Sequence, residues 1–67
     1  INNNTKKLVF DHAVKLQARL IRDIRPSDFQ ELDMHPAVIS RYLNILDDEG
    51  KILRKLINGL VWWEVVS

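Results

Sequence analysis

The chain has 67 residues, of which 46% are hydrophobic and 28% are charged, and its formal net charge is +1 from 10 basic and 9 acidic residues. This composition is typical of one small globular domain, and no apolar run is long enough to span a membrane. The chain has no cysteine, which excludes disulfides and thiolate metal sites, and its near-neutral charge gives no general attraction to nucleic acid.

The first helix is predicted over residues 5–24, after a polar N-terminus at residues 1–4 that we expect to be frayed. Its apolar residues follow helical spacing and form one stripe: Val9, Ala13, Leu16, Leu20 and Ile24. A second row, formed by Phe10, Val14 and Ile21, makes the stripe wider than that of most surface helices. Because a small chain must bury much of its surface, packing within the domain is the favoured explanation, and the seam of a homodimer is the alternative.

A short second helix is predicted over residues 27–33. Pro26 disfavours helical geometry at Arg25, so the first helix must end before this pair. The residues from Ser27 to Gln30 have the form of a capping box, in which a serine cap is followed by a glutamine three residues later. A tight turn then leads into the next helix, which gives the helix-turn-helix order.

The third helix is predicted over residues 36–49. Pro36 suits the first helical position, and Gly50 can leave the helix in a left-handed conformation. One face is apolar at helical spacing and is expected to be buried: Ile39, Tyr42, Leu43 and Leu46. The opposite face carries small or hydrogen-bonding side chains: Ala37, Arg41, Asn44 and Asp48, with Ser40 at its margin. Such a face can lie against a flat, polar surface.

After the third helix the pattern changes, and residues 52–66 are predicted to form a β-hairpin. The Asn58-Gly59 pair favours a type I′ turn, because this turn needs a positive φ at both central residues. The two-residue loop fixes the register of the strands, from Ile57 opposite Leu60 to Ile52 opposite Val65. The more apolar face is expected to meet the core: Ile52, Leu56, Val61, Trp63 and Val65. Trp62 and Lys55 would then lie together on the outside.

The run from His35 to Ile52 resembles the third helix of winged helix-turn-helix transcriptional regulators. The matching features are a Val-Ser-Arg-like centre, two leucines, an acidic run, a glycine and an apolar residue: Ile39-Ser40-Arg41, Leu43, Leu46, Asp47-Asp48-Glu49, Gly50 and Ile52. The resemblance covers about residues 8–66. It implies an α+β, winged helix-turn-helix fold with three helices and a two-stranded wing. A very short third strand is implied between Asp23 and Ser27.

The resemblance also implies that residues 36–49 are a recognition helix, which enters the major groove of double-stranded DNA while the wing follows the backbone. Arg41 is the leading candidate for a base or phosphate contact; alternatively, it only solvates the helix face, paired with Asp47 or Asp48. The expected DNA-binding residues come from this helix, its start and the wing: His35, Ala37, Ser40, Arg41, Asn44, Lys51, Arg54 and Lys55. This interpretation requires the basic members of the set to lie on one continuous face.

A protein-interaction module is the alternative function. The predicted wing tip from Leu56 to Leu60 is apolar where a DNA-binding wing is usually basic, and this suits a protein contact. The expected partners are therefore DNA, a protein at the wing tip, or a second copy of the chain at Phe10, Val14 and Ile21. Two histidines without a cysteine or a Gly-rich phosphate loop give no support for an enzyme, a cofactor or a metal. We expect the cytoplasm, the nucleoid or, in a eukaryote, the nucleus as its location.

Overall fold

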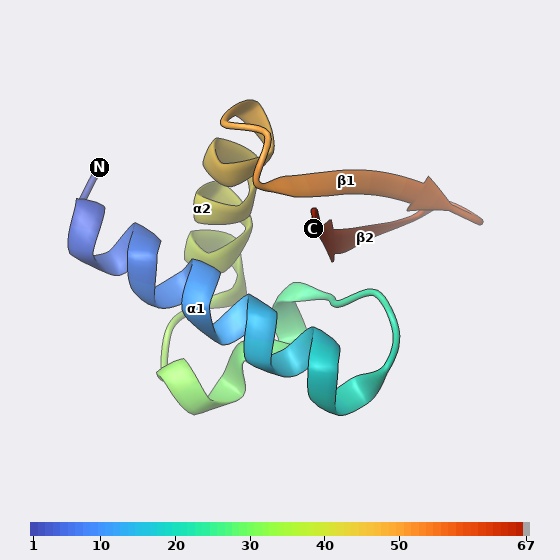
Figure 1. The fold of residues 1–67 in the computed structure, drawn as a ribbon, viewed down its shortest axis with the longest axis horizontal. Coiled ribbons are helices and arrows are strands. Elements are labelled where there is room, and N and C mark those ends of the chain that lie inside the picture. The colour runs from blue at the N-terminus through green and yellow to red at the C-terminus, as the bar shows by residue number, and fades with distance from the viewer. Residues whose placement is uncertain (67) are drawn as a thin grey trace.

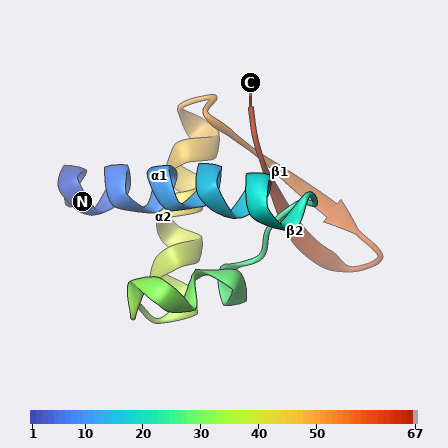
Figure 2. The ribbon, with the colours of Figure 1, turned by 60° about the horizontal axis from the view of Figure 1, so that its bottom comes forward.

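The computed structural model describes residues 1–66. They form, in chain order, five elements: helix α1 (Asn3–Leu20), 3-10 helix η1 (Pro26–Leu32), helix α2 (Pro36–Asp48) and strands β1 (Ile52–Ile57) and β2 (Leu60–Val65). Helix α1 crosses α2, and the antiparallel hairpin extends from the C-terminal end of α2 (Figure 1). The turned view in Figure 2 shows η1 beside the N-terminal end of α2. The predicted α+β fold is confirmed, with three helices followed by a two-stranded hairpin in the layout of a winged helix.

Helix α1 begins and ends earlier than predicted. Its cap is Asn2, whose side-chain oxygen accepts hydrogen bonds from the backbone N–H groups of Asn4 at 2.9 Å and Thr5 at 3.1 Å. The helix ends at Leu20 because Ile21 adopts a left-handed conformation with a φ of 53°. The predicted end at residue 24 is therefore wrong, and the residues after Ile21 are free to run beside the hairpin.

This segment supplies the short third strand, which is confirmed as a single bridge. Ile24 and Trp63 exchange two backbone hydrogen bonds, each 2.8 Å long. Both side chains are buried, so the bridge lies over the core. Residues on either side of Ile24 are thereby held against β2.

The second helix is a 3-10 helix, and its predicted capping box at Ser27 is wrong. The chain is still extended at Arg25, and the helix begins at Pro26, whose missing N–H suits the first helical position. Asp28 takes the place predicted for the glutamine, because its carboxylate accepts the backbone N–H of Arg25 at 2.9 Å. Phe29 is buried in the core.

Helix α2 matches its prediction closely and ends at Asp48. The His35 Nδ1 atom accepts the backbone N–H of Ala37 at 3.0 Å, which caps the start of the helix. The predicted apolar face is buried. Gly50, with a φ of 76°, turns the chain towards β1.

The hairpin has the predicted register at every pair from Ile52–Val65 to Ile57–Leu60. Its turn has a positive φ at both central residues, 52° at Asn58 and 79° at Gly59. Trp63 is buried as predicted, but Leu56 is 67% exposed. Leu56 lies one pair from the turn, where the strands extend beyond the helices and no element covers it (Figure 1).

The core lies where the three helices meet the base of the hairpin. Its buried apolar residues come from every element: Val9, Ala13, Leu16, Ile24, Phe29, Ile39, Tyr42, Leu43, Leu46, Ile52 and Trp63. The second apolar row of α1 is not covered as expected, since Val14 is 44% exposed and Ile21 is 88% exposed. Only Phe10 packs against the core. Within residues 1–66, no helix has both the length and the apolar character needed to cross a membrane.

Candidate nucleic-acid interface

The outer face of α2 presents the side chains that the sequence assigned to it. Ala37, Arg41 and Asn44 are exposed, and Ser40 is half-buried beside them. Within residues 1–66, Arg41 forms no ion pair or side-chain hydrogen bond, so the alternative pairing with Asp47 or Asp48 is not observed. Its guanidinium is therefore available to an external partner.

A depression of about 280 Å³ separates α2 from the hairpin, and we call it the α2–hairpin depression. Its lining residues come from α2, the hairpin and the segment before η1: Arg25, Pro26, Ser40, Asn44, Arg54, Val61 and Trp63. Three predicted site residues, Ser40, Asn44 and Arg54, are thus brought together. None of the lining residues is acidic, so the walls combine cationic and hydrogen-bonding groups.

Arg25 also lines the depression, although no sequence motif points to it. The bridge between Ile24 and Trp63 places Arg25 beside β2, and its guanidinium lies 5.4 Å from the centroid of the Trp62 ring. Its backbone N–H donates a hydrogen bond to the Asp28 carboxylate. Arg25 lies outside any helical or strand periodicity, and the only sequence signal was Pro26, which keeps the preceding residue extended.

Two nitrogen atoms near the depression lack hydrogen-bond partners. Arg25 Nη1 and Trp63 Nε1 are both buried, and no acceptor among the described residues reaches either of them. A buried donor without an acceptor costs about 1–3 kcal/mol. Both atoms belong to residues that line the α2–hairpin depression.

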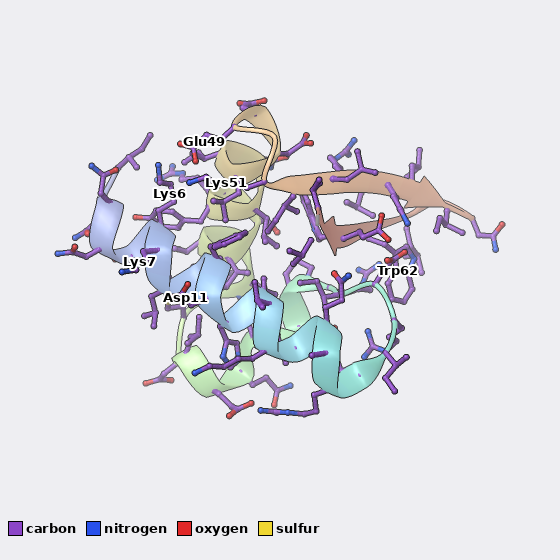
Figure 3. All side chains as sticks on the ribbon, in the orientation of Figure 1. Lys6, Lys7, Asp11, Glu49, Lys51 and Trp62 are labelled. Carbon is purple, nitrogen blue, oxygen red and sulfur yellow. The ribbon has the colours of Figure 1, made fainter. Side chains whose placement is uncertain are left out.

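Lys51 does not line the α2–hairpin depression. Its ammonium is 3.8 Å from a Glu49 carboxylate oxygen and 5.9 Å from the centroid of the Phe10 ring. Lys6 approaches the same carboxylate at 2.6 Å, and the hydrogen bond from Lys6 is the main reason that the pKa of Glu49 is lowered. Figure 3 shows these groups together where α1 passes the C-terminal end of α2. Lys51 is therefore part of a tie between α1 and the end of α2.

Lys55 is also engaged within the domain. Its ammonium lies 3.1 Å from Glu64 and 3.3 Å from Asp23. Hydrogen bonding to these two carboxylates, that to Glu64 first, raises the pKa of Lys55 above its ordinary value. Successive strand residues point to opposite faces, so Lys55 and Arg54 lie on opposite sides of the hairpin. The continuous basic face that the prediction required, through Arg41, Lys51, Arg54 and Lys55, does not form.

The arginines divide into two groups. Arg19 is bound to Glu31 at 2.9 Å, and Arg22 makes two hydrogen bonds of 3.0 Å to Asp28. The others, Arg25, Arg41 and Arg54, have no carboxylate partner in the described part of the chain. Arg25 and Arg54 line the α2–hairpin depression, and Arg41 follows Ser40 on α2.

Comparison of the chain with protein-family models, with curated proteins and with solved structures finds no match. In residues 1–66, no three His, Asp or Glu side chains are grouped so that they could hold a metal ion.

Proposed function

We propose that this chain is a DNA-binding domain that places α2 in the major groove, with the α2–hairpin depression beside the DNA backbone. One observation carries the proposal. The three arginines without a carboxylate partner in residues 1–66 all belong to α2 or to the depression next to it. A transcriptional regulator and the recognition module of a larger DNA-processing protein would both use such a surface.

The chemistry of α2 suits a base-reading helix. The major groove admits an α-helix, and arginine and asparagine can each make paired hydrogen bonds to base edges. Ala37 is small enough to allow close approach near the start of the helix. At the other end, Asp47 and Asp48 repel phosphates, so the first half of α2 is the part that enters the groove.

The experiment that tests this function is fluorescence anisotropy with a random-sequence DNA duplex at several salt concentrations. We expect binding that weakens steeply with salt, because cationic side chains displace counterions from the DNA. Arg41→Ala should weaken binding, and it should reduce the salt slope by about one if Arg41 contacts a phosphate. Lys15→Ala is the matched control, because Lys15 is an exposed cation on α1, outside the α2–hairpin surface.

Absence of binding at low salt would overturn the proposed function. If the Arg41 and Lys15 variants bind the duplex with equal affinity, α2 is not part of the DNA interface. The measurement therefore distinguishes a failure of DNA binding from a failure of the assigned helix.

A protein-interaction module is the second candidate, and the exposed hairpin tip favours it. Leu56, Ile57 and Leu60 are all exposed around the turn. They form an apolar tip, which suits a protein partner better than a phosphate backbone. The anisotropy experiment separates the two candidates, because a module that binds only protein shows no salt-dependent binding to the duplex.

A further inference from the structure

We propose that the outer edge of β1 binds an extended segment of another protein. The segment adds to the hairpin as a further antiparallel strand and carries an acidic residue opposite Arg54. This inference goes beyond DNA binding and does not rest on it. It assigns a place and a chemistry to a protein partner of the hairpin.

The two edges of the hairpin differ. The outer side of β2 is covered, because Trp63 exchanges two backbone hydrogen bonds with Ile24 and the Val65 N–H donates to Gln17 Oε1 at 2.6 Å. Among the described residues, β1 has only β2 beside it, and its outer edge runs clear of the helices beyond its base (Figure 1 and Figure 2). The domain therefore leaves one strand edge open.

The pairing of Trp63 determines which backbone groups of β1 point outward. In an antiparallel ladder, two opposite residues either bond to each other or both point their N–H and C=O groups away. Trp63 bonds outward to Ile24, so Arg54, which lies opposite Trp63, points its own groups away from β2. Leu56, two residues further along, does the same. Within residues 1–66, neither residue makes a backbone hydrogen bond outside the sheet, so both can pair with an extended chain.

The apolar side chains of β1 favour a partner that is largely apolar. Leu53, Leu56 and Ile57 are all exposed. Residues directly opposite each other on neighbouring strands lie close together and pack on the same face of the sheet. Apolar residues of an added strand would therefore cover these three side chains.

The charged side chains of β1 favour one acidic residue in that partner. Lys55 is already close to the carboxylates of Glu64 and Asp23, so it needs no external partner. Arg54 is exposed, and no carboxylate in the described part of the chain pairs with it. An acidic residue directly opposite Arg54 would form a cross-strand ion pair, which stabilises the added strand.

A second copy of β1 fits this edge less well. Symmetric antiparallel pairing centred on Arg54 places two guanidinium groups opposite each other, and pairing centred on Lys55 does the same with two ammonium groups. Like charges directly opposite on neighbouring strands are destabilising. The edge therefore favours an acidic partner over another copy of the chain.

The probe for the test is the fluorescein-labelled peptide Ser-Val-Val-Thr-Glu-Val-Ser, whose binding is followed by fluorescence anisotropy. Paired antiparallel, it places its glutamate opposite Arg54 and its valines opposite the exposed apolar residues of β1. N-methylation of the glutamate and of the second valine removes N–H groups that face β1, so it should abolish binding. N-methylation of the threonine and of the first valine is the matched control, because these N–H groups face away from β1, and binding should persist.

Two variants of the domain test the same contact. Arg54→Glu should weaken binding of the probe about fivefold and should favour a peptide with lysine in place of the glutamate. Lys15→Glu is the control, because it makes the same change of charge at an exposed position on α1. Leu56→Pro removes an outward N–H without breaking a hydrogen bond to β2, so the hairpin should form and the probe should not bind. The two methylated peptides keep the test valid if this variant does not fold.

Hydrogen exchange followed by NMR locates the contact. In the unmodified chain, the amide protons of Arg54 and Leu56 should exchange faster than that of Lys55, and excess probe should slow both. No binding at millimolar probe, equal binding of the two methylated peptides, or protection of amides outside β1 would overturn the proposal. Dimerisation that Leu56→Pro abolishes would also overturn it, since a second copy would then occupy the edge.

Discussion

Ile21 has a backbone conformation that is unusual for its residue type. Three non-glycine residues have a positive φ, Ile21, Asp33 and Asn58, within the described chain. Asp and Asn tolerate the left-handed region, but a β-branched side chain there is strained by about 1–2 kcal/mol. Ile21 nevertheless ends α1 and directs the chain towards β2, and its side chain is 88% exposed. The strain is therefore not offset by burial of the side chain.

We predict that Ile21→Gly stabilises the domain. Glycine adopts a positive φ without a steric penalty, so the free energy of unfolding should rise by about 1 kcal/mol. For a domain of this size the melting temperature should rise by about 4–8 °C, as measured by thermal denaturation followed by circular dichroism. Val14→Gly is the control of opposite sign, because Val14 is an exposed residue inside the helix, where glycine is unfavourable. A lower melting temperature for Ile21→Gly would mean that the isoleucine side chain is buried in solution.

At the scale of elements, the start of η1 depends on Asp28. Its carboxylate accepts two hydrogen bonds from the Arg22 guanidinium and one from the backbone N–H of Arg25. The bonds from Arg22 are the largest cause that lowers the pKa of Asp28 from its ordinary value of 3.8, and the bond from Arg25 acts in the same direction. Asp28 therefore connects the end of the bridging segment to η1.

The lowered pKa predicts an acid-dependent loss of stability at Asp28. The folded state favours the ionised carboxylate, so its contribution is present above the unfolded pKa and is lost as the pH falls through the folded pKa. Asp28→Asn should lower the free energy of unfolding by about 1 kcal/mol at neutral pH, a small value because Arg22 is largely solvated. Urea titrations at pH 7 and at pH values below 3.8 measure the effect. The difference between variant and unmodified chain should shrink in acid, and a constant difference would exclude ionisation as its cause. Asp48→Asn, at an exposed position, is the control.

The elements that the sequence predicted correctly are those set by local rules. The hairpin register follows from the Asn58-Gly59 turn, and α2 follows from its Pro36 start and apolar spacing. The path of the chain after α1 depends instead on a partner distant in sequence, through the pairing of Ile24 with Trp63. The cap of η1 is local, but it joins Asp28 to Arg25 and not Gln30 to Ser27 as predicted. The pairing of Ile24 with Trp63 also brings Arg25 to the candidate site, so no local pattern could have revealed that residue.

At the scale of the whole molecule, internal ion pairs determine which basic residues remain for a partner. Lys6, Lys51 and Lys55 are each close to carboxylates, although two of them were predicted DNA contacts. Helical and strand spacing indicates which residues share one element's face, but not which charges meet between elements. For that reason Ser40, Asn44 and Arg54 line one depression, whereas Lys51 and Lys55 are paired with carboxylates elsewhere.

The homodimer through α1 stays a prediction at this scale. Val14 on α1 and Ile21, which caps the C-terminal end of α1, are exposed, as a dimer seam requires, while Phe10 is partly buried against the core. If the seam exists, light scattering should give twice the mass of the 7.9 kDa chain, and Val14→Glu should return it to the mass of one chain. Leu56→Glu, at the distant hairpin tip, should leave the mass unchanged. A single-chain mass for the unmodified protein at high concentration would exclude the dimer.

The adjacent tryptophans of β2 have a consequence for the uniqueness of the fold. A shift of the strand by one residue would exchange Trp62 and Trp63 and still present an indole ring to the helices. The size of the two tryptophan side chains therefore discriminates poorly between the native register and a register shifted by one residue. The competitor is disfavoured by Glu64, which would turn inward without a partner, and by the turn, whose positive φ at Gly59 admits only one alignment readily. The two tryptophans therefore contribute to the stability of the hairpin, while Glu64 and Gly59 determine its register.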